Sequence, residues 1–319
     1  MSVDVRQAPE LELEQYRTEL TGYCYRMLGS AFEAEDAVQE TLVKAWRNLG
    51  SFEGRSKLRT WLYSIATNVC LDMAGARERR ARPMDLGPAR EPVIENLATR
   101  PEVTWITPVP DGLVIPDGDP ADVAVARESI RLAFVAALQH LPPRQRAVLI
   151  LCEVLRWKAS EVAELLDTSV ASVNSALQRA RASLDEADTA ATTKDVDPEL
   201  LQRYVAAFES YDIEALTSLL AEDAQQSMPP YDLWLRGRDD VLTWWFGPGI
   251  GCQGSRLVPV AQTNGAPAWG QYKPAPGGGY EPWALQVIEF SGDRVVECTF
   301  FLDTDAVFPL YGLPARLDA

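Results

Sequence analysis

SEVAELLDTSVASVNSALQRAR, residues 160–181, predicts a short helix, a three-residue turn and a second helix. The helices are expected over 160–166 and 170–184, and Asp167-Thr168-Ser169 can both turn the chain and cap the second helix. This is helix-turn-helix spacing. Ala163, Val173 and Leu177 would face inward. The side chains expected outward can read base edges or hold phosphates: Ser172, Asn174, Ser175, Gln178 and Arg179. On spacing alone, an ordinary helical hairpin with a polar face remains the alternative.

Residues 10–82 also have helical periodicity. Along 37–49, Ala37, Val38, Thr41, Leu42, Ala45, Trp46 and Leu49 form one apolar face. A glycine-bounded break over 50–54 precedes a third helix, with Leu58, Trp61, Leu62, Ile65, Ala66, Val69 and Leu71 expected inward.

Charge is unevenly distributed along the chain. The net charge of -16 argues against a protein that coats nucleic acid without specificity. Residues 44–82 nevertheless carry nine basic and three acidic side chains, a net charge of +6, whereas residues 197–319 have a net charge of -10. The basic stripe indicates one limited polyanion contact, with a solvated helix face as the alternative.

Eight prolines make a continuous helix impossible over residues 83–120, which we interpret as a linker. Its apolar stretches at 103–106 and 113–115 suggest that it lies on a surface with Trp105 as an anchor; a partly disordered tether is the alternative. Helices are expected over 123–140 and 144–156, before the helix-turn-helix.

The chain changes character after residue 194. Helices are predicted over 198–210 and 213–220, and strands over 257–262, 269–272, 283–290 and 294–302, with a hairpin turn at 291–293. Helices followed by antiparallel strands indicate an α+β domain.

Three segments resemble the extracytoplasmic-function (ECF) sigma factors of the sigma-70 family. Residues 36–46 resemble the region 2 helix that binds polymerase, residues 52–68 are similar to the promoter-melting segment, and residues 141–149 with the helix-turn-helix resemble region 4. The resemblance covers residues 10–188 and implies core RNA polymerase and promoter DNA as partners. It implies a polymerase-binding helix edge at Asp36, Gln39, Glu40 and Lys44.

The same resemblance implies two DNA contacts. Region 2 would bind the -10 element through Phe52, Arg55, Ser56, Lys57, Arg59, Trp61, Asn68, Arg77, Arg79 and Arg80. Among these, Trp61 would mainly support the site and Asn68 would contact a base. Region 4 would bind the -35 element through Arg144, Arg146, Ser172, Asn174, Ser175, Gln178 and Arg179. The family commonly has a basic residue near Asn174 and Ala176, so its absence here suggests weaker or differently specified -35 contact.

The tail resembles the SnoaL-like branch of the NTF2-like α+β cone fold. Trp244, Trp245 and Phe246 could line a ligand pocket, although plain core packing is at least as consistent. The tail has no histidine, because His140 is the only one in the chain. Asp223, Asp232 and Asp239 are conceivable bases, but surface carboxylates are the better interpretation. We therefore expect no catalytic residues and a regulatory tail.

We predict a multidomain protein: two all-α domains (10–82 and 121–188) around a Pro-rich linker (83–120), then an α+β SnoaL-like domain (197–313). The five scattered cysteines predict neither a disulfide framework nor a zinc site, and no cofactor or metal is expected. No apolar run of about 18 residues and no signal peptide are found, so we expect a cytoplasmic protein without a membrane partner.

The function indicated is promoter selection by a sigma factor whose tail modulates its activity. Two rivals stay open: a small-molecule isomerase or cyclase in the C-terminal domain, and a DNA-binding repressor independent of polymerase. An anti-sigma protein or a small-molecule ligand stays open as a further partner.

Overall fold

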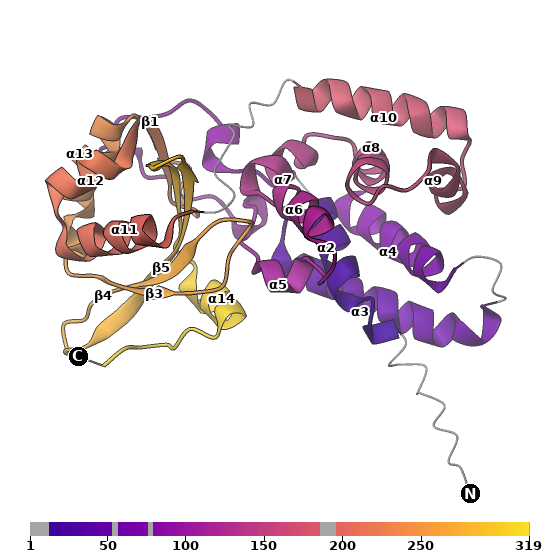
Figure 1. Cartoon of the computed structure of the whole chain (residues 1–319), viewed down its shortest axis with the longest axis horizontal. Coiled ribbons are helices and arrows are strands. Elements are labelled where there is room, and N and C mark those ends of the chain that lie inside the picture. The colour runs from indigo at the N-terminus through magenta and orange to yellow at the C-terminus, as the bar shows by residue number, and fades with distance from the viewer. Residues whose placement is uncertain (1–12, 53–56, 76–78, 186–195, 319) are drawn as a thin grey trace, which may run out of the picture. The chain divides into compact units, whose positions relative to one another are not determined.

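The computed structural model describes residues 13–52, 57–75, 79–185 and 196–318. The chain forms two compact units (Figure 1). The first comprises Met1–Arg80 and Asp111–Asp188, and the second comprises Ala81–Pro110 and Thr189–Ala319. Both helical segments therefore belong to one unit, and most of the proline-rich segment belongs with the tail. Within the described residues, each helix is too short or too polar to traverse a bilayer.

The first unit begins with three packed helices: α2 (Arg17–Leu28), α3 (Ala31–Asn48) and α4 (Leu58–Gly75). Gly29 ends α2 in the left-handed conformation, at φ 71°, and the Ser30 side chain caps α3 by accepting from the Glu33 amide. The core holds the Tyr23 and Tyr63 rings 5.2 Å apart, and the Tyr23 and Thr67 hydroxyls share a 2.8 Å hydrogen bond.

Shorter helices complete this unit: α5 (Asp111–Val114), α6 (Pro120–Glu128), α7 (Leu132–Gln139) and α8 (Pro143–Leu149), the last continued by a π-helical turn over Ile150–Val154. The prediction of one continuous helix over 123–140 was wrong. The chain breaks after α6, where the Ser129 hydroxyl bonds the Ala126 carbonyl at 2.6 Å and Ile130 is buried. Likewise, the helix predicted to Arg156 ends earlier, since Arg156 has φ 59°.

The predicted helix-turn-helix is confirmed as α9 (Ala159–Leu165) and α10 (Val170–Asp185). The turn closes through the Thr168 amide, which donates to the Ala163 carbonyl at 2.9 Å, and the Ser169 hydroxyl accepts from the Ser172 amide at 3.1 Å. Ala163 and Val173 are buried as expected.

The second unit is built on a six-stranded sheet with strand order β2-β1-β6-β5-β4-β3. Its strands are β1 (Leu220–Ser227), β2 (Trp234–Arg236), β3 (Arg256–Pro259), β4 (Ala268–Pro274), β5 (Tyr280–Ser291) and β6 (Arg294–Phe301). All neighbours are antiparallel except β1 and β6, which run parallel. The sequence prediction missed β1 and β2. The β1 segment LAEDAQQS lacks the β-branched and aromatic residues typical of strands, so sheet packing rather than propensity makes it extended.

Helices α11 (Pro198–Ser210), α12 (Ile213–Leu219) and α13 (Arg238–Phe246) pack against the sheet (Figure 1). Their shared core includes Tyr204, Phe208 and Trp245 from the helices with Phe290 and Phe300 from the sheet. The short α14 (Thr304–Val307) follows β6, and Phe308 after it packs edge-to-face on Tyr272 at 5.2 Å. These strands and helices agree with the expected α+β cone.

Residues 81–110, here called the strap, pack onto the second unit, in agreement with a linker that lies on a surface with Trp105 as an anchor. The strap buries Trp105, Ile106 and Val109. Its backbone pairs with the rest of the unit in its middle and near its C-terminal end: the Asp232 amide donates to the Ala98 carbonyl at 2.9 Å, and the Val109 amide donates to Asn264 Oδ1 at 3.0 Å. Paired backbone of this kind explains how a proline-rich segment without long helices stays ordered.

Candidate nucleic-acid and polymerase interface

The solvent face of α3 carries the predicted polymerase edge. Asp36, Gln39 and Glu40 are exposed, and the half-buried Lys44 pairs with Glu40 at 2.7 Å, one helical turn away. The four side chains therefore lie along one accessible strip of a rigid helix.

Trp46 was predicted to face inward, and this was wrong. Its side chain is 56% exposed, and Val43 beside it on α3 is 47% exposed. Trp46 follows Val38 by eight residues, which rotates it about 80° from the buried stripe. A helical-wheel position at the edge of the stripe was the signal that could have identified it. Exposed large apolar side chains on a rigid helix are typical of binding surfaces.

Some of the residues predicted to bind the -10 element are exposed or in contact with one another. The Phe52 and Trp61 rings pack 4.9 Å apart at 33°, and both are half-buried. Lys57 and Asn68 are exposed. Aromatic surface next to amide and ammonium groups can stack on and hydrogen-bond an unstacked base. The predicted contacts Arg55, Ser56 and Arg77 lie outside the described residues.

Arg59 is bound within the protein. Its guanidinium pairs with the Glu19 carboxylate at 2.8 Å and lies over the Tyr63 and Trp157 rings, 5.2 and 5.5 Å from their centroids. Burial alone would lower the pKa of Arg59, but Tyr63 and Glu19 outweigh it and raise the pKa. Because Trp157 precedes α9, Arg59 also links α4 to the helix-turn-helix portion of the unit.

The arginines after α4 have different surroundings. Arg79 is exposed and lies 2.9 Å from Nδ1 of His140, so it can still reach a phosphate. Arg80 contradicts the prediction of a phosphate contact. Its side chain is 8% exposed and pairs with Glu33 at 2.8 Å, which leaves little surface for DNA.

The outer row of α10 is presented as predicted. Ser172, Asn174, Ser175, Gln178 and Arg179 are all exposed, and Arg144 at the start of α8 is exposed too. A polar row on the second helix of a helix-turn-helix is able to enter a major groove and read base edges.

Arg146 contradicts its predicted role as an exposed -35 contact. It is 5% exposed, and its guanidinium donates to the Met27 carbonyl, to Gln139 Oε1 at 2.5 Å, and to the Gln139 and Leu141 carbonyls, both at 3.1 Å. Burial lowers the pKa of Arg146 to about 10, so the side chain stays charged at neutral pH. Arg146 thus anchors α8 to the end of α2.

Arg26 makes a similar contact in the opposite direction, from α2 to the C-terminal end of α6. Its guanidinium donates to Ser129 Oγ at 2.8 and 2.9 Å and to the carbonyls of Ala126 and Gly22, at 3.1 and 2.6 Å. Gln139 Nε2 donates to the Arg26 carbonyl at 3.2 Å. Two buried arginines, one from each helical segment, therefore join residues before 80 to residues after 125.

The aromatic cluster of the second unit is mainly core. Trp244 and Trp245 are buried and line a cavity of about 30 Å³ together with Tyr211, Gln226 and Gln271; Phe246 is not among its lining residues. That volume holds about one water molecule. Asp223 and Asp239 are exposed. Asp232 is buried, where it pairs with Arg100 at 3.1 Å and Arg90 at 3.5 Å, both in the strap.

Comparisons with known proteins match each part of the chain. The Sigma-70 region 2 family matches residues 13–80, the Sigma-70 region 4 family residues 131–184, and the SnoaL-like domain family residues 201–298. The chain is 46% identical to ECF RNA polymerase sigma factor SigG of Mycobacterium tuberculosis H37Rv over 313 residues, covering 95% of this chain and 83% of SigG.

A second relative is similar in fold. ECF RNA polymerase sigma factor SigJ of M. tuberculosis H37Rv is 29% identical over 255 residues, covering 75% of this chain and 74% of SigJ. The crystal structure of M. tuberculosis SigJ covers 96% of this chain and 99% of its own, with a TM-score of 0.61 at 23% identity.

Proposed function

Because this chain belongs to the ECF sigma factors of RNA polymerase, we propose that it binds core polymerase through α3 and directs promoter opening. In this proposal the Phe52–Asn68 face captures the -10 element and the outer row of α10 reads the -35 element. The observation that carries the proposal is this exposed polar row, presented by a capped helix-turn-helix.

Run-off transcription with purified core polymerase tests the proposal. We expect specific initiation with the full chain and a strong loss with Asn68→Ala, while Asp72→Ala, an exposed change one turn further along α4, serves as the matched control. Initiation at background level with the unmodified chain would overturn the proposed function. The cytoplasm, where core polymerase acts, is its proposed location.

The arrangement of the first unit supports a further step, in which region 4 separates from region 2. Elements centred about 25 base pairs apart are separated by about 85 Å of B-form DNA. A compact unit of roughly 160 residues has a radius of gyration of only about 15 Å. The closed unit, joined by Arg26 and Arg146, is too small to contact both elements together.

Energy transfer between fluorophores can measure this opening. We suggest labels introduced through unnatural amino acids at Asp72 and Ser183, both exposed and outside the proposed contacts. Transfer should be high in the free chain and fall when core polymerase and promoter DNA are added. High transfer in the active promoter complex would contradict the opening.

We propose that the SnoaL-like unit modulates activity by holding the strap. The strap lies in the sequence between the two DNA-binding segments, so its attachment limits how far they can separate. Arg82 is one of the contacts that hold it: its Nη1 lies 3.8 Å from Oε2 of Glu297 in β6. Deleting the chain beyond residue 196 should change promoter-specific output, and unchanged output would contradict this role.

We also propose that the second unit is not catalytic. Its aromatic cavity has room for about one water molecule, and the buried carboxylate of Asp232 is neutralised by two arginines. A general base needs a free, positioned carboxylate next to a substrate-sized space.

A further inference from the structure

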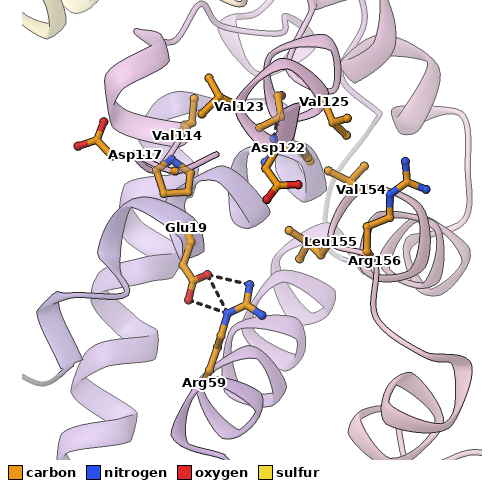
Figure 2. Close-up of a pocket in the computed structure, with 14 residues that line it drawn as sticks. Glu19, Arg59, Val114, Asp117, Asp122, Val123, Val125, Val154, Leu155 and Arg156 are labelled. Atoms are coloured by element: carbon orange, nitrogen blue, oxygen red, sulfur yellow. Dashed lines mark hydrogen bonds and ion pairs between the residues drawn. The ribbon is translucent and has the colours of Figure 1, made fainter. Parts of the chain in front are cut away.

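A cavity of about 360 Å³ lies in the first unit between α2, α4, α6 and the turn at Val154–Arg156 (Figure 2). Its volume falls within the range of small-molecule sites. Val114, Pro116, Val123 and Leu155 give it apolar walls. This cavity is separate from the surfaces proposed to bind polymerase and DNA, apart from Arg59 at its floor.

Both helical segments contribute to the cavity. Glu19 and Arg59 come from the region 2 helices, whereas Asp122, Val123 and Leu155 come from the residues after 120. Val114 lies close to α2: a Cβ at Gly22 would overlap the Val114 carbonyl oxygen, so only glycine fits there. The cavity therefore exists only while the two segments are packed together.

The charged groups around the cavity differ in what they already bind. Glu19 and Arg59 form a two-point ion pair, with Arg59 Nη2 and Nε 2.8 and 2.9 Å from Glu19 Oε2. The donors of Arg26 are taken by Ser129 and backbone carbonyls. The exposed side chains of Asp117, Asp122 and Arg156, by contrast, make no hydrogen bond or ion pair within the described part of the chain.

Figure 2 shows how these groups lie. The Asp122 carboxylate points into the space between Leu155 and the Glu19–Arg59 pair, whereas Asp117 points away from it. Asp122 is exposed at the rim of the cavity, with its carboxylate above an apolar wall, whereas the Arg156 guanidinium points away from that carboxylate. This arrangement favours a ligand with one cationic group and an apolar body.

We propose that this cavity binds a small organic cation, an amine or guanidine with an apolar body, whose charged group pairs with Asp122 and whose body lies against Val114, Pro116 and Leu155. Because the ligand binds only the closed unit, it shifts the population toward that form. The effect of the ligand on transcription rests on the proposed function, whereas the binding site itself does not.

Titration calorimetry with the full chain and no polymerase tests the site, using phenethylammonium as the probe and phenethyl alcohol as its uncharged equivalent. A nine-atom ligand is expected to bind with a Kd of about 1 mM. We expect saturable binding of the amine and none of the alcohol. Asp122→Asn should weaken binding at least tenfold, and Asp117→Asn, the matched control on the same rim, should leave it within about twofold.

No saturable heat with the unmodified chain would overturn the site. Equal loss in Asp117→Asn and Asp122→Asn would also overturn it, because the attraction would then be diffuse and not specific to Asp122.

Transcription forms the second arm of the test. At ten times its Kd the amine should lower the open fraction, and with it promoter output, about tenfold. Unchanged output despite calorimetric binding would overturn the closing effect. Absence of transcription without any amine would instead count against the proposed function, so the two failures are distinguishable.

Discussion

Replacing Asp232 by asparagine should release the strap from the SnoaL-like unit. The Asp232 side chain is 3% exposed and lies 3.1 Å from Arg100 Nη2 and 3.5 Å from Arg90 Nη1. Asparagine keeps the shape and removes the charge. Both arginines then lose their counter-ion, and the amide adds donors facing them.

The magnitude follows from the exposure of the partners. A buried hydrogen bond to a charged group contributes about 1.5–3 kcal/mol. The side chains of Arg90 and Arg100 are 41% and 53% exposed, so water screens them and can solvate them after the change. Taking about 1 kcal/mol for each pair, strap opening becomes easier by about 2 kcal/mol, which is roughly a 30-fold change in its equilibrium.

Hydrogen–deuterium exchange measures this opening directly. The Arg100 amide donates to the Pro230 carbonyl at 3.0 Å and the Asp232 amide to the Ala98 carbonyl at 2.9 Å, so both amides become unprotected when the strap leaves. We expect roughly 30-fold faster exchange at these two amides. Asp239→Asn, an exposed carboxylate on α13, is the control. Unchanged protection at both amides in Asp232→Asn would refute the reasoning.

Four other substitutions test two surfaces and one buried contact. Trp46→Ala should weaken core polymerase binding at least tenfold in interferometry, while Tm stays the same because Trp46 is mostly exposed; equal affinity would remove Trp46 from the interface. Gln178→Ala should weaken the binding free energy by about 1–3 kcal/mol for promoter duplex only, because Gln178 would read a base edge. Arg179→Ala should reduce the slope of log affinity against log salt by about one, because Arg179 would hold a phosphate. Fluorescence anisotropy measures both, with the exposed Ser183→Ala as control. Gly22→Ala should lower the free energy of unfolding by about 2 kcal/mol in urea titration because its Cβ meets the Val114 carbonyl, whereas Gly75→Ala, with open space around it, should not; equal midpoints would show that α5 can move aside.

Local signals were enough to predict much of the fold. The helix predicted over 198–210 is α11, because Asp197 caps it, Pro198 occupies its first turn and the apolar residues recur at helical spacing. The helix-turn-helix was predictable for the same reason: its cap, turn and inward residues lie within 22 residues of sequence.

Features that depend on distant contacts were not predictable. Strand β1 is extended because β6 and β2 pair with it on either side, which no local pattern reports. The strap could not be distinguished from a linker, since its partners Asp232 and Asn264 lie more than 130 residues away. Arg80 and Arg146 were assigned to DNA from the family resemblance, yet each has buried acceptors in another helix.

The chemistry of the contact between regions 2 and 4 suits two segments that must separate. A contact held by apolar burial would expose that surface to water on opening, at about 25 cal/mol for each Å². Alongside apolar contacts such as the Tyr63 and Trp157 rings, 5.1 Å apart, Arg26 and Arg146 hold the segments through hydrogen bonds to carbonyls, a hydroxyl and an amide. Burying a guanidinium without a carboxylate partner carries a desolvation cost, which is why the pKa of both arginines is lowered to about 10. Opening restores their hydration and offsets the lost hydrogen bonds, so these two arginines contribute more to the specificity of the closed form than to its strength.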